Sequence, residues 1–290
     1  MANTIDTHHK ELRRLAKELA LTVKDLFYDN GPNGHCYFFE NRLIPSDTDF
    51  IDMFRPVAQA ITSDLEQMKV HGKISYDSPH RREVDRLNMR EWFEKRGVTG
   101  LITKVLRAAY VGEYGLEIDQ QSALNLLLEI GEESAADEFH LFGDSDERFH
   151  IAEGNDSVPT RLAQRLQRDV ELDTHLEAIA SEGSRFCLTV RRDNASTDIK
   201  AEILVLALPF TILRELRMDV DLPGAKRKAI HELGYGTNAK LIAGCSRRVW
   251  EESSVGEQRF DTRSSGYTSR TLVSNAAGKR AADSRALMPS

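Results

Sequence analysis

The residue whose type and position most suggest chemistry is Lys240. It lies inside an apolar stretch, NAKLIAGC, in which the alternation of side chains predicts a β-strand, with Lys240 on the same face as Asn238 and Ile242. If that face is covered, the ammonium group loses water and needs a partner, a bound water or a lowered pKa. Enzymes use lysines in this state. The alternative, which the spacing alone favours, is an outward lysine on a half-solvated sheet.

A second candidate is the turn Gly154-Asn155-Asp156. It connects a predicted strand, Phe149 to Ile151, with a predicted helix, Thr160 to Gln167. Backbone amides at such a turn can approach an anion. A single glycine is weak evidence, and an ordinary strand-to-helix turn capped by Asp156 or Ser157 is the simpler interpretation.

Other chemical signatures are missing from the sequence. It contains no GxGxxG, no GxxxxGK[ST] and no GxSxG pattern. The three cysteines are far apart and form no CxxC pair, which gives no zinc signature and no disulfide framework. His8 and His9 are adjacent on a predicted helix, where their side chains would point about 100° apart and rarely bind one ion. We therefore expect no metal site.

Composition restricts the class of protein. The chain has 290 residues, 40% hydrophobic and 29% charged, which is typical of a globular protein. A net charge of −7 argues against nucleic acid as a partner. No apolar run approaches the roughly 18 residues that span a bilayer, so we expect no membrane segment. The polar start, MANTIDTHHKEL, resembles neither a signal nor a transit peptide, so a cytoplasmic location is the default expectation.

Periodicity predicts a mixed α and β fold. Apolar spacing predicts helices over residues 6–27, 47–68, 103–110 and 122–130, with another helix capped by Asn88, and residues 71–85 form a predicted surface loop. Alternation predicts strands over residues 36–39, 42–44, 171–179, 185–190 and 199–208. The serine-rich end, residues 251–290, has the composition of a disordered segment.

Two long segments resemble the flavin-containing amine oxidase family, which includes monoamine, polyamine and L-amino-acid oxidases. LVLALPFTILRE followed by LPGAKRKAIHELGYGTNAKLIAGCSRRVW looks like the family segment that joins a strand of the FAD domain to the substrate domain. FGDSDERFHIAEGNDSVPTRLAQRL looks like the segment that returns to the FAD domain. IDTHHKELRRLAKELAL and EYGLEIDQQSALNLL resemble a helix of the FAD domain and a helical part of the substrate domain.

The resemblance implies roles for individual residues. Lys240 falls where the family places a lysine that holds a water beside flavin N5. Ala207 and Pro209 fall on a segment that runs along the cofactor, and Leu176 falls where a backbone group meets the adenine. Gly154 matches the second of two glycines near FAD. Glu153 stands in place of the first, which brings bulk and negative charge toward the diphosphate.

The resemblance also implies a fold and domains. The expected fold is α+β, a substrate domain with the central part of an FAD-binding domain and an incomplete Rossmann-like part. We expect a remnant of the FAD domain over 1–32, a helical substrate part over 33–148, FAD-domain strands over 149–210, a substrate-domain sheet over 211–252 and a disordered tail over 253–290. The glycine fingerprint and the last cofactor segment are absent, as a truncated or frameshifted reading frame would produce.

The implied activity is FAD-dependent oxidative deamination of a small-molecule amine or amino acid. In the family, a hydride passes to flavin N5 and oxygen accepts the electrons, which yields hydrogen peroxide. A chain without the diphosphate-binding turn would need a complementing subunit that carries it. The alternative function is a non-catalytic remnant or interaction subunit without FAD, whose uncovered apolar faces would drive association.

Overall fold

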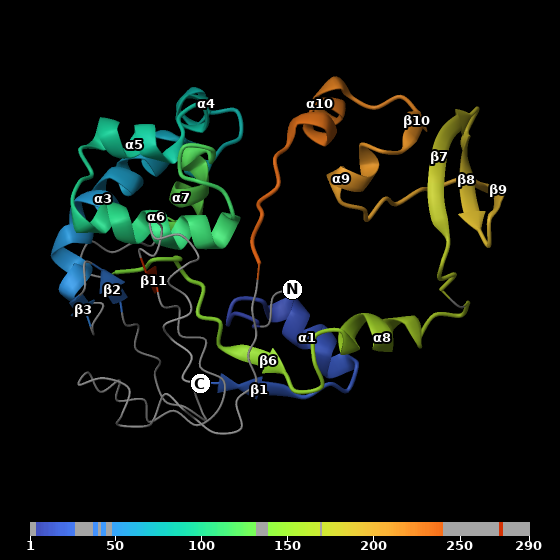
Figure 1. Ribbon diagram of the computed structural model, residues 1–290, viewed down its shortest axis with the longest axis horizontal. Helices are drawn as coiled ribbons and strands as arrows, with labels where there is room; N and C mark the ends of the chain where they lie inside the picture. Colours follow the sequence, from blue (N-terminus) through green and yellow to red (C-terminus); the bar gives the residue numbers. More distant parts are fainter. Residues whose placement is uncertain are drawn as a thin grey trace, which may run out of the picture. The chain divides into compact units, whose positions relative to one another are not determined.

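The computed structural model describes residues 4–26, 37–39, 42–44, 48–131, 139–168, 170–239 and 273–274 (Figure 1). The chain divides into two compact units. The first comprises residues 1–158 and 236–290, and the second comprises residues 159–235. Each unit combines helices with strands, which confirms the predicted mixed fold class. The predicted tail is outside the described residues apart from 273–274. The division into five segments of the FAD domain, the substrate domain and the tail remains a prediction.

The first unit holds most of the helices. They are α1 (Lys10–Glu18), α3 (Thr48–Gln67), α4 (Pro79–Asp85), α5 (Met89–Arg96), α6 (Leu101–Tyr114) and α7 (Ala123–Ile130). The short helix α8 (Ser157–Ala163) crosses the boundary between the two units. Helices α3, α4, α5, α6 and α7 lie together (Figure 1) and share a core of buried apolar side chains, which includes Phe50, Phe54, Trp92, Phe93 and Tyr110.

Short strands complete this unit. β1 (Val23–Asp25) pairs antiparallel with β6 (Phe149–Ile151), and β4 (Lys69–Val70) forms a hairpin with β5 (Lys73–Ile74). β2 (Tyr37–Phe39) and β3 (Arg42–Ile44) form the predicted hairpin, and β11 (Val273–Ser274) runs parallel to β2. A small second core beside α1, made by Ile5, Ala16, Leu19, Leu21, Phe149 and Ile151, joins the N-terminal residues to β6.

The second unit is built on one sheet. β7 (His175–Glu182), β8 (Arg185–Arg192) and β9 (Ala195–Ala201) form an antiparallel meander, and β10 (Arg217–Asp219) adds to β7 in parallel (Figure 1). Two short helices follow the meander, α9 (Phe210–Leu213) and α10 (Gly224–Glu232). The side chain of Arg214 binds the C-terminal end of α10, because its Nε donates to the carbonyl of Ile230 at 2.5 Å.

Several helices follow their sequence signals. α3 covers nearly the whole predicted span. Asn88 caps α5, and its side chain and that of Glu91 form a reciprocal capping box, with distances of 2.9 Å in both directions. Ser122 caps α7 through its hydroxyl, which accepts from the amide of Leu124 at 3.2 Å. The strands β6, β7 and β8 also lie at the predicted places, within a few residues.

Other predictions are wrong. The first helix is shorter than predicted, because α1 ends at Glu18 and Val23 belongs to β1. Residues 71–85 are not a loop but contain β5 and α4. Helix α6 continues through Gly112 and ends at Gly115, which has a φ of +66°. The predicted helix after Gly154 begins and ends earlier, at Ser157 and Ala163. The predicted strand over 199–208 is correct only to Ala201, and Ile203 to Leu208 form no strand.

Candidate functional site

Lys240 itself lies outside the described residues, but the chain that leads to it is firmly placed. The side-chain amide of Asn238 donates to the carbonyls of Gly112 and Glu113 at 2.8 and 2.9 Å, and the amide of Thr237 donates to Gly115 at 3.0 Å. A Cβ on Gly236 would lie only 1.8 Å from the carbonyl oxygen of Tyr114. The approach to Lys240 is therefore packed against the C-terminal end of α6.

Gly154 forms the predicted turn between β6 and α8. Its φ is +93°, a backbone conformation that residues other than glycine rarely adopt. A Cβ at this position would lie 2.7 Å from Oδ1 of Asp156. The glycine is thus required by the turn itself. Because α8 has only seven residues, its N-terminus alone does not identify an anion site.

Glu153 has a structural use that the sequence did not reveal. Its carboxylate accepts hydrogen bonds from the amide of Thr22, at 3.0 and 3.2 Å, and from the Thr22 hydroxyl, at 2.8 Å. The amide of Ala152 also donates to the carbonyl of Thr22, at 2.9 Å. Glu153 therefore fixes the segment between α1 and β1 to the end of β6.

The other three predicted cofactor residues lie in the second unit. Leu176 is on β7 beside a β-bulge that separates it from Ala178. β10 pairs only with Ala178 to Ala180, so among the described residues β7 has no strand neighbour on that side at Leu176. Ala207 and Pro209 lie in an exposed, extended segment that ends where α9 begins. Ala207 and Pro209 are thus exposed, whereas Leu176 is partly buried and pairs with Val190 of β8.

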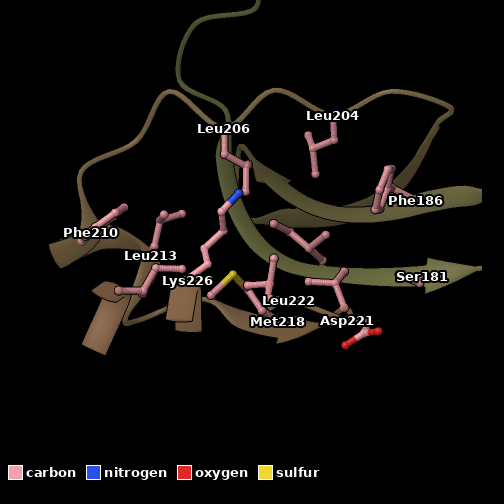
Figure 2. Close-up of a pocket in the computed structure, with 13 residues that line it drawn as sticks. Ser181, Phe186, Leu204, Leu206, Phe210, Leu213, Met218, Asp221, Leu222 and Lys226 are labelled. Carbon is pink, nitrogen blue, oxygen red and sulfur yellow. The ribbon is translucent and has the colours of Figure 1, made fainter. Parts of the chain in front are cut away.

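Leu204 and Leu206, from the same extended segment, line an apolar cavity of about 490 Å³ in the second unit (Figure 2). Ile179 of β7, Met218 of β10 and Ile230 of α10 also line it. Lys226 contributes a positive charge among the lining residues, and Asp221 contributes a negative one. The cavity therefore separates the β7–β10 edge of the sheet from the two short helices.

The extended segment from Ile203 to Leu208 is unusual because apolar side chains point to both of its sides. Leu204 and Leu206 line the cavity, whereas Ile203 and Val205 are each 83% exposed. Within the described part of the chain, this segment has no strand partner. A continuous apolar run of this kind is typical of a strand covered on both faces of a sheet.

A second cavity, of about 700 Å³, lies in the first unit. Its lining includes Asp6, Glu113, Glu129, Asp144 and Glu147, and no lysine or arginine occurs among the described residues that line it. Sequence reasoning missed these carboxylates because they come from four separate segments. The only local signal was the density of acidic residues between positions 144 and 147.

The pKa values of Glu129, which lines this cavity, and of Tyr114, which contacts Glu129, are both raised. Burial raises the pKa of Glu129, and the charge of Glu113 raises it further. Burial and the adjacent Glu129 raise the pKa of Tyr114 to about 12, and its hydroxyl donates to Oε2 of Glu129 at 3.3 Å. Tyr110, stacked on Tyr114, is fully buried and donates to the carbonyl of Leu141. Tyr110 thus belongs to the core of the first unit.

Comparison with known proteins identifies the family. The model of the flavin containing amine oxidoreductases matches residues 2–289. The chain belongs to this family. L-amino-acid oxidases of the snakes Bothrops jararacussu and Bothriechis schlegelii are 22% and 21% identical over 112 and 118 residues. These matches cover 38% and 40% of this chain but only 22% and 24% of the oxidases.

Solved structures of the family have the same fold. Putrescine oxidase in complex with putrescine is 16% identical, with a TM-score of 0.64 over 80% of this chain and 52% of that enzyme. Cyclohexylamine oxidase from Brevibacterium oxydans IH-35A is 16% identical, with a TM-score of 0.63 over 78% of this chain and 50% of that enzyme. The chain thus spans about half the length of these structures, with an incomplete α+β fold of the flavin amine oxidase type.

Family membership implies a flavin cofactor, and the described residues fit it in part. In the second unit, residues 207–209 are exposed, and Leu176 has no strand neighbour on the β10 side of β7 among the described residues. The turn at Gly154 lies in the first unit. The 290 residues contain no glycine fingerprint that could surround a diphosphate. In the described part of the chain, no helix is both long and apolar enough to cross a membrane.

Proposed function

We propose that this chain takes part in the FAD-dependent oxidative deamination of an amine or amino acid, with oxygen as electron acceptor and hydrogen peroxide as product. The observation that carries the proposal is the family match over residues 2–289. FAD, when bound, supplies the hydride acceptor, and the protein supplies orientation and electrostatics. The structures named for putrescine and cyclohexylamine oxidation support an amine as the substrate class.

In this proposal the chain holds the cofactor with backbone rather than with charged side chains. Leu176 provides a backbone contact for the adenine, and the Ala207 to Pro209 segment lies along the cofactor. Gly154 would allow the chain to approach the cofactor closely at the turn, because glycine has no side chain, and its φ of +93° is one that other residues rarely adopt. Glu153 is held by Thr22, which supports a role in keeping this turn fixed.

Lys240 is the proposed catalytic residue. Its ammonium group would hold a water near the site where oxygen is reduced and would favour the transfer of electrons to oxygen through its positive charge. The hydrogen bonds of Asn238 support this role, because they fix the backbone two residues before Lys240 onto α6. A positioned charge is more effective than a mobile one, since its orientation is established before the reaction.

We also propose that a complementing polypeptide supplies the diphosphate-binding βαβ unit. The segment from Ile203 to Leu208 supports this, because it has apolar side chains on both sides and no strand partner among the described residues. A strand of the complementing polypeptide would pair with its free backbone groups and cover Val205. The second candidate function, a non-catalytic subunit that associates through this apolar segment, rests on the same exposure.

The test is an absorption spectrum of the purified chain with FAD, alone and together with a polypeptide carrying the glycine-rich βαβ unit of a family member. We expect flavin bands to co-purify with the complex. Val205→Asp should abolish the complex, whereas Ile199→Asp, at an exposed site on β9, should not. Absence of bound flavin from a complex that does form would refute the enzyme and leave the non-catalytic subunit.

A kinetic experiment addresses Lys240 separately. In a flavin-loaded complex, Lys240→Met should slow the reoxidation of reduced flavin by oxygen by about 100-fold or more, since the loss of one preorganised hydrogen-bond donor from an active site costs on the order of 2.7–4 kcal/mol, a factor of about 10²–10³. Anaerobic reduction by the amine should change much less. An unchanged rate of reoxidation would show that Lys240 does not have this role.

A further inference from the structure

We propose that Asp6, His8 and His9 form a binding site for a divalent transition metal ion, of which Zn²⁺ is the best match. One ligand atom from each side chain can be chosen such that all three lie within 4.8 Å of one another. Two imidazoles and one carboxylate are a donor set that suits Zn²⁺, and three protein ligands leave a fourth position for water. The site is distinct from the proposed flavin-binding residues.

The local fold brings the two histidines together. They precede α1, which begins at Lys10, so the helical geometry that would have separated adjacent side chains does not apply. Their ring centroids are 4.4 Å apart, with an angle of 66° between the ring planes. The reason for expecting no metal at this pair, namely their position on a helix, is therefore wrong.

Asp6 is held in place by the end of the chain segment that precedes β6. Its Oδ1 accepts from the amide of Glu147 at 2.6 Å and from the hydroxyl of Ser145 at 3.1 Å. Its Oδ2 lies 3.8 Å from Nε2 of His9, longer than a hydrogen bond but close to the spacing of about 3.4 Å between two ligands of tetrahedral zinc. A hydrogen-bonded carboxylate of this kind is typical of metal sites.

The surroundings favour a cation. Asp6, His8 and His9 line the acidic cavity of the first unit, together with Glu113 and Glu129. Asp144 and Glu147 line the same cavity, and among its described lining residues no lysine or arginine balances these carboxylates. A divalent ion bound by Asp6, His8 and His9 would reduce the repulsion between them.

Metal binding competes with one existing hydrogen bond. The amide of Asp6 donates to Nδ1 of His9 at 3.2 Å, so the proton of the neutral ring lies on Nε2. To bind the ion through Nε2, His9 must move that proton to Nδ1, and the amide of Asp6 loses its acceptor. The NMR signal of this amide thus reports specifically on coordination at His9.

The experiment uses the full chain without a histidine tag. Zn²⁺ is titrated by calorimetry, and Co²⁺ by visible absorption, which detects tetrahedral coordination. We expect one ion per chain, an affinity about tenfold or more weaker in His8→Gln and in His9→Gln, and a shifted Asp6 amide signal. His8→Gln is the variant least able to disturb folding, because His8 is exposed.

The matched control is His231→Gln, which removes an exposed histidine from the second unit. It should bind zinc like the unchanged chain. Equal affinities of the unchanged chain and His8→Gln, or binding that leaves the Asp6 amide signal in place, would overturn the proposal and indicate adventitious surface binding only. Because no flavin is involved, failure here would not affect the proposed oxidase function.

Discussion

Replacing Asp64 with asparagine should destabilise the first unit more than any exposed charge substitution. The Asp64 side chain is completely buried at the end of α3. Its Oδ1 accepts from Nε2 of His80 at 2.8 Å, and its Oδ2 accepts from Nε1 of Trp92 at 2.7 Å and from Nε of Arg96 at 3.0 Å. One carboxylate thus joins α3 to α4 and α5.

The size of the expected loss of stability follows from the burial of Asp64. Removing one partner of a buried ion pair costs about 3–5 kcal/mol, because the other charge stays behind without compensation. Here Arg96 is 37% exposed and His80 is 20% exposed, so water recovers part of the loss. The asparagine also turns an NH₂ group toward side chains that are themselves donors. We therefore expect a loss of about 3 kcal/mol in the free energy of unfolding.

The matched control is Asp52→Asn, in the same helix. Asp52 pairs with Arg55 at 2.7 Å, but its side chain is 88% exposed, and such pairs contribute only about 0–1 kcal/mol. Urea unfolding followed by fluorescence of Trp92, in a background in which the only other tryptophan, Trp250, is phenylalanine, reports on this unit. A difference below about 1 kcal/mol between the two variants would refute the reasoning.

Three further predictions concern the first unit. Gly236→Ala should destabilise it by about 2 kcal/mol or more, since the new Cβ would overlap the Tyr114 carbonyl, whereas Gly234→Ala should not; equal unfolding midpoints would contradict this. Glu129→Gln should raise stability in urea unfolding at pH 7 but not near pH 4, because the raised pKa of Glu129 means that folding favours its protonated form; an equal gain at both pH values would contradict this. Alkaline absorption titration should show Tyr114 ionising near pH 12, by difference from Tyr114→Phe; ionisation near pH 10 would contradict the raised pKa.

The sequence predicted those elements whose signals are local. Asn88 and Glu91 are three residues apart, and together they determine where α5 begins. The hairpin of β2 and β3 is likewise encoded within nine residues, 36–44. In each case the groups that decide the structure are neighbours in the chain, so a single stretch of sequence contains the necessary information.

Helix α4 was missed because its support comes from elsewhere. Only Val84 of this helix is buried, so its sequence shows no apolar periodicity. Ser78 caps the helix locally, and the hydrogen bond from His80 to Asp64, sixteen residues earlier in the chain, ties it to α3. The prediction that the helix over 103–110 stops before Gly112 was also wrong, since α6 continues to Tyr114. A Cβ there would touch nothing, so the glycine lies on an open face of α6, where its cost of about 1 kcal/mol is tolerated.

Of the candidate site, the turn at Gly154 was predicted correctly from its place between a predicted strand and a predicted helix. Its positive φ explains why a glycine stands there. The hydrogen bonds of Glu153 to Thr22 join positions 131 residues apart, which no periodicity in the sequence can encode. The same holds for the acidic cavity, in which Asp6 meets Glu129 and Glu147 only after folding.

The segment from Ile203 to Leu208 has the sequence of a strand but does not form one. Its apolar run and its β-branched residues favour a strand, yet among the described residues it has no neighbour to pair with. A strand is stabilised by the ladder it joins, so propensity without a partner gives only an extended chain. Val205 is exposed, therefore, although its segment favours a strand, because no described strand pairs with the segment. Pairing and burial of this segment are what the proposed complementing polypeptide would add.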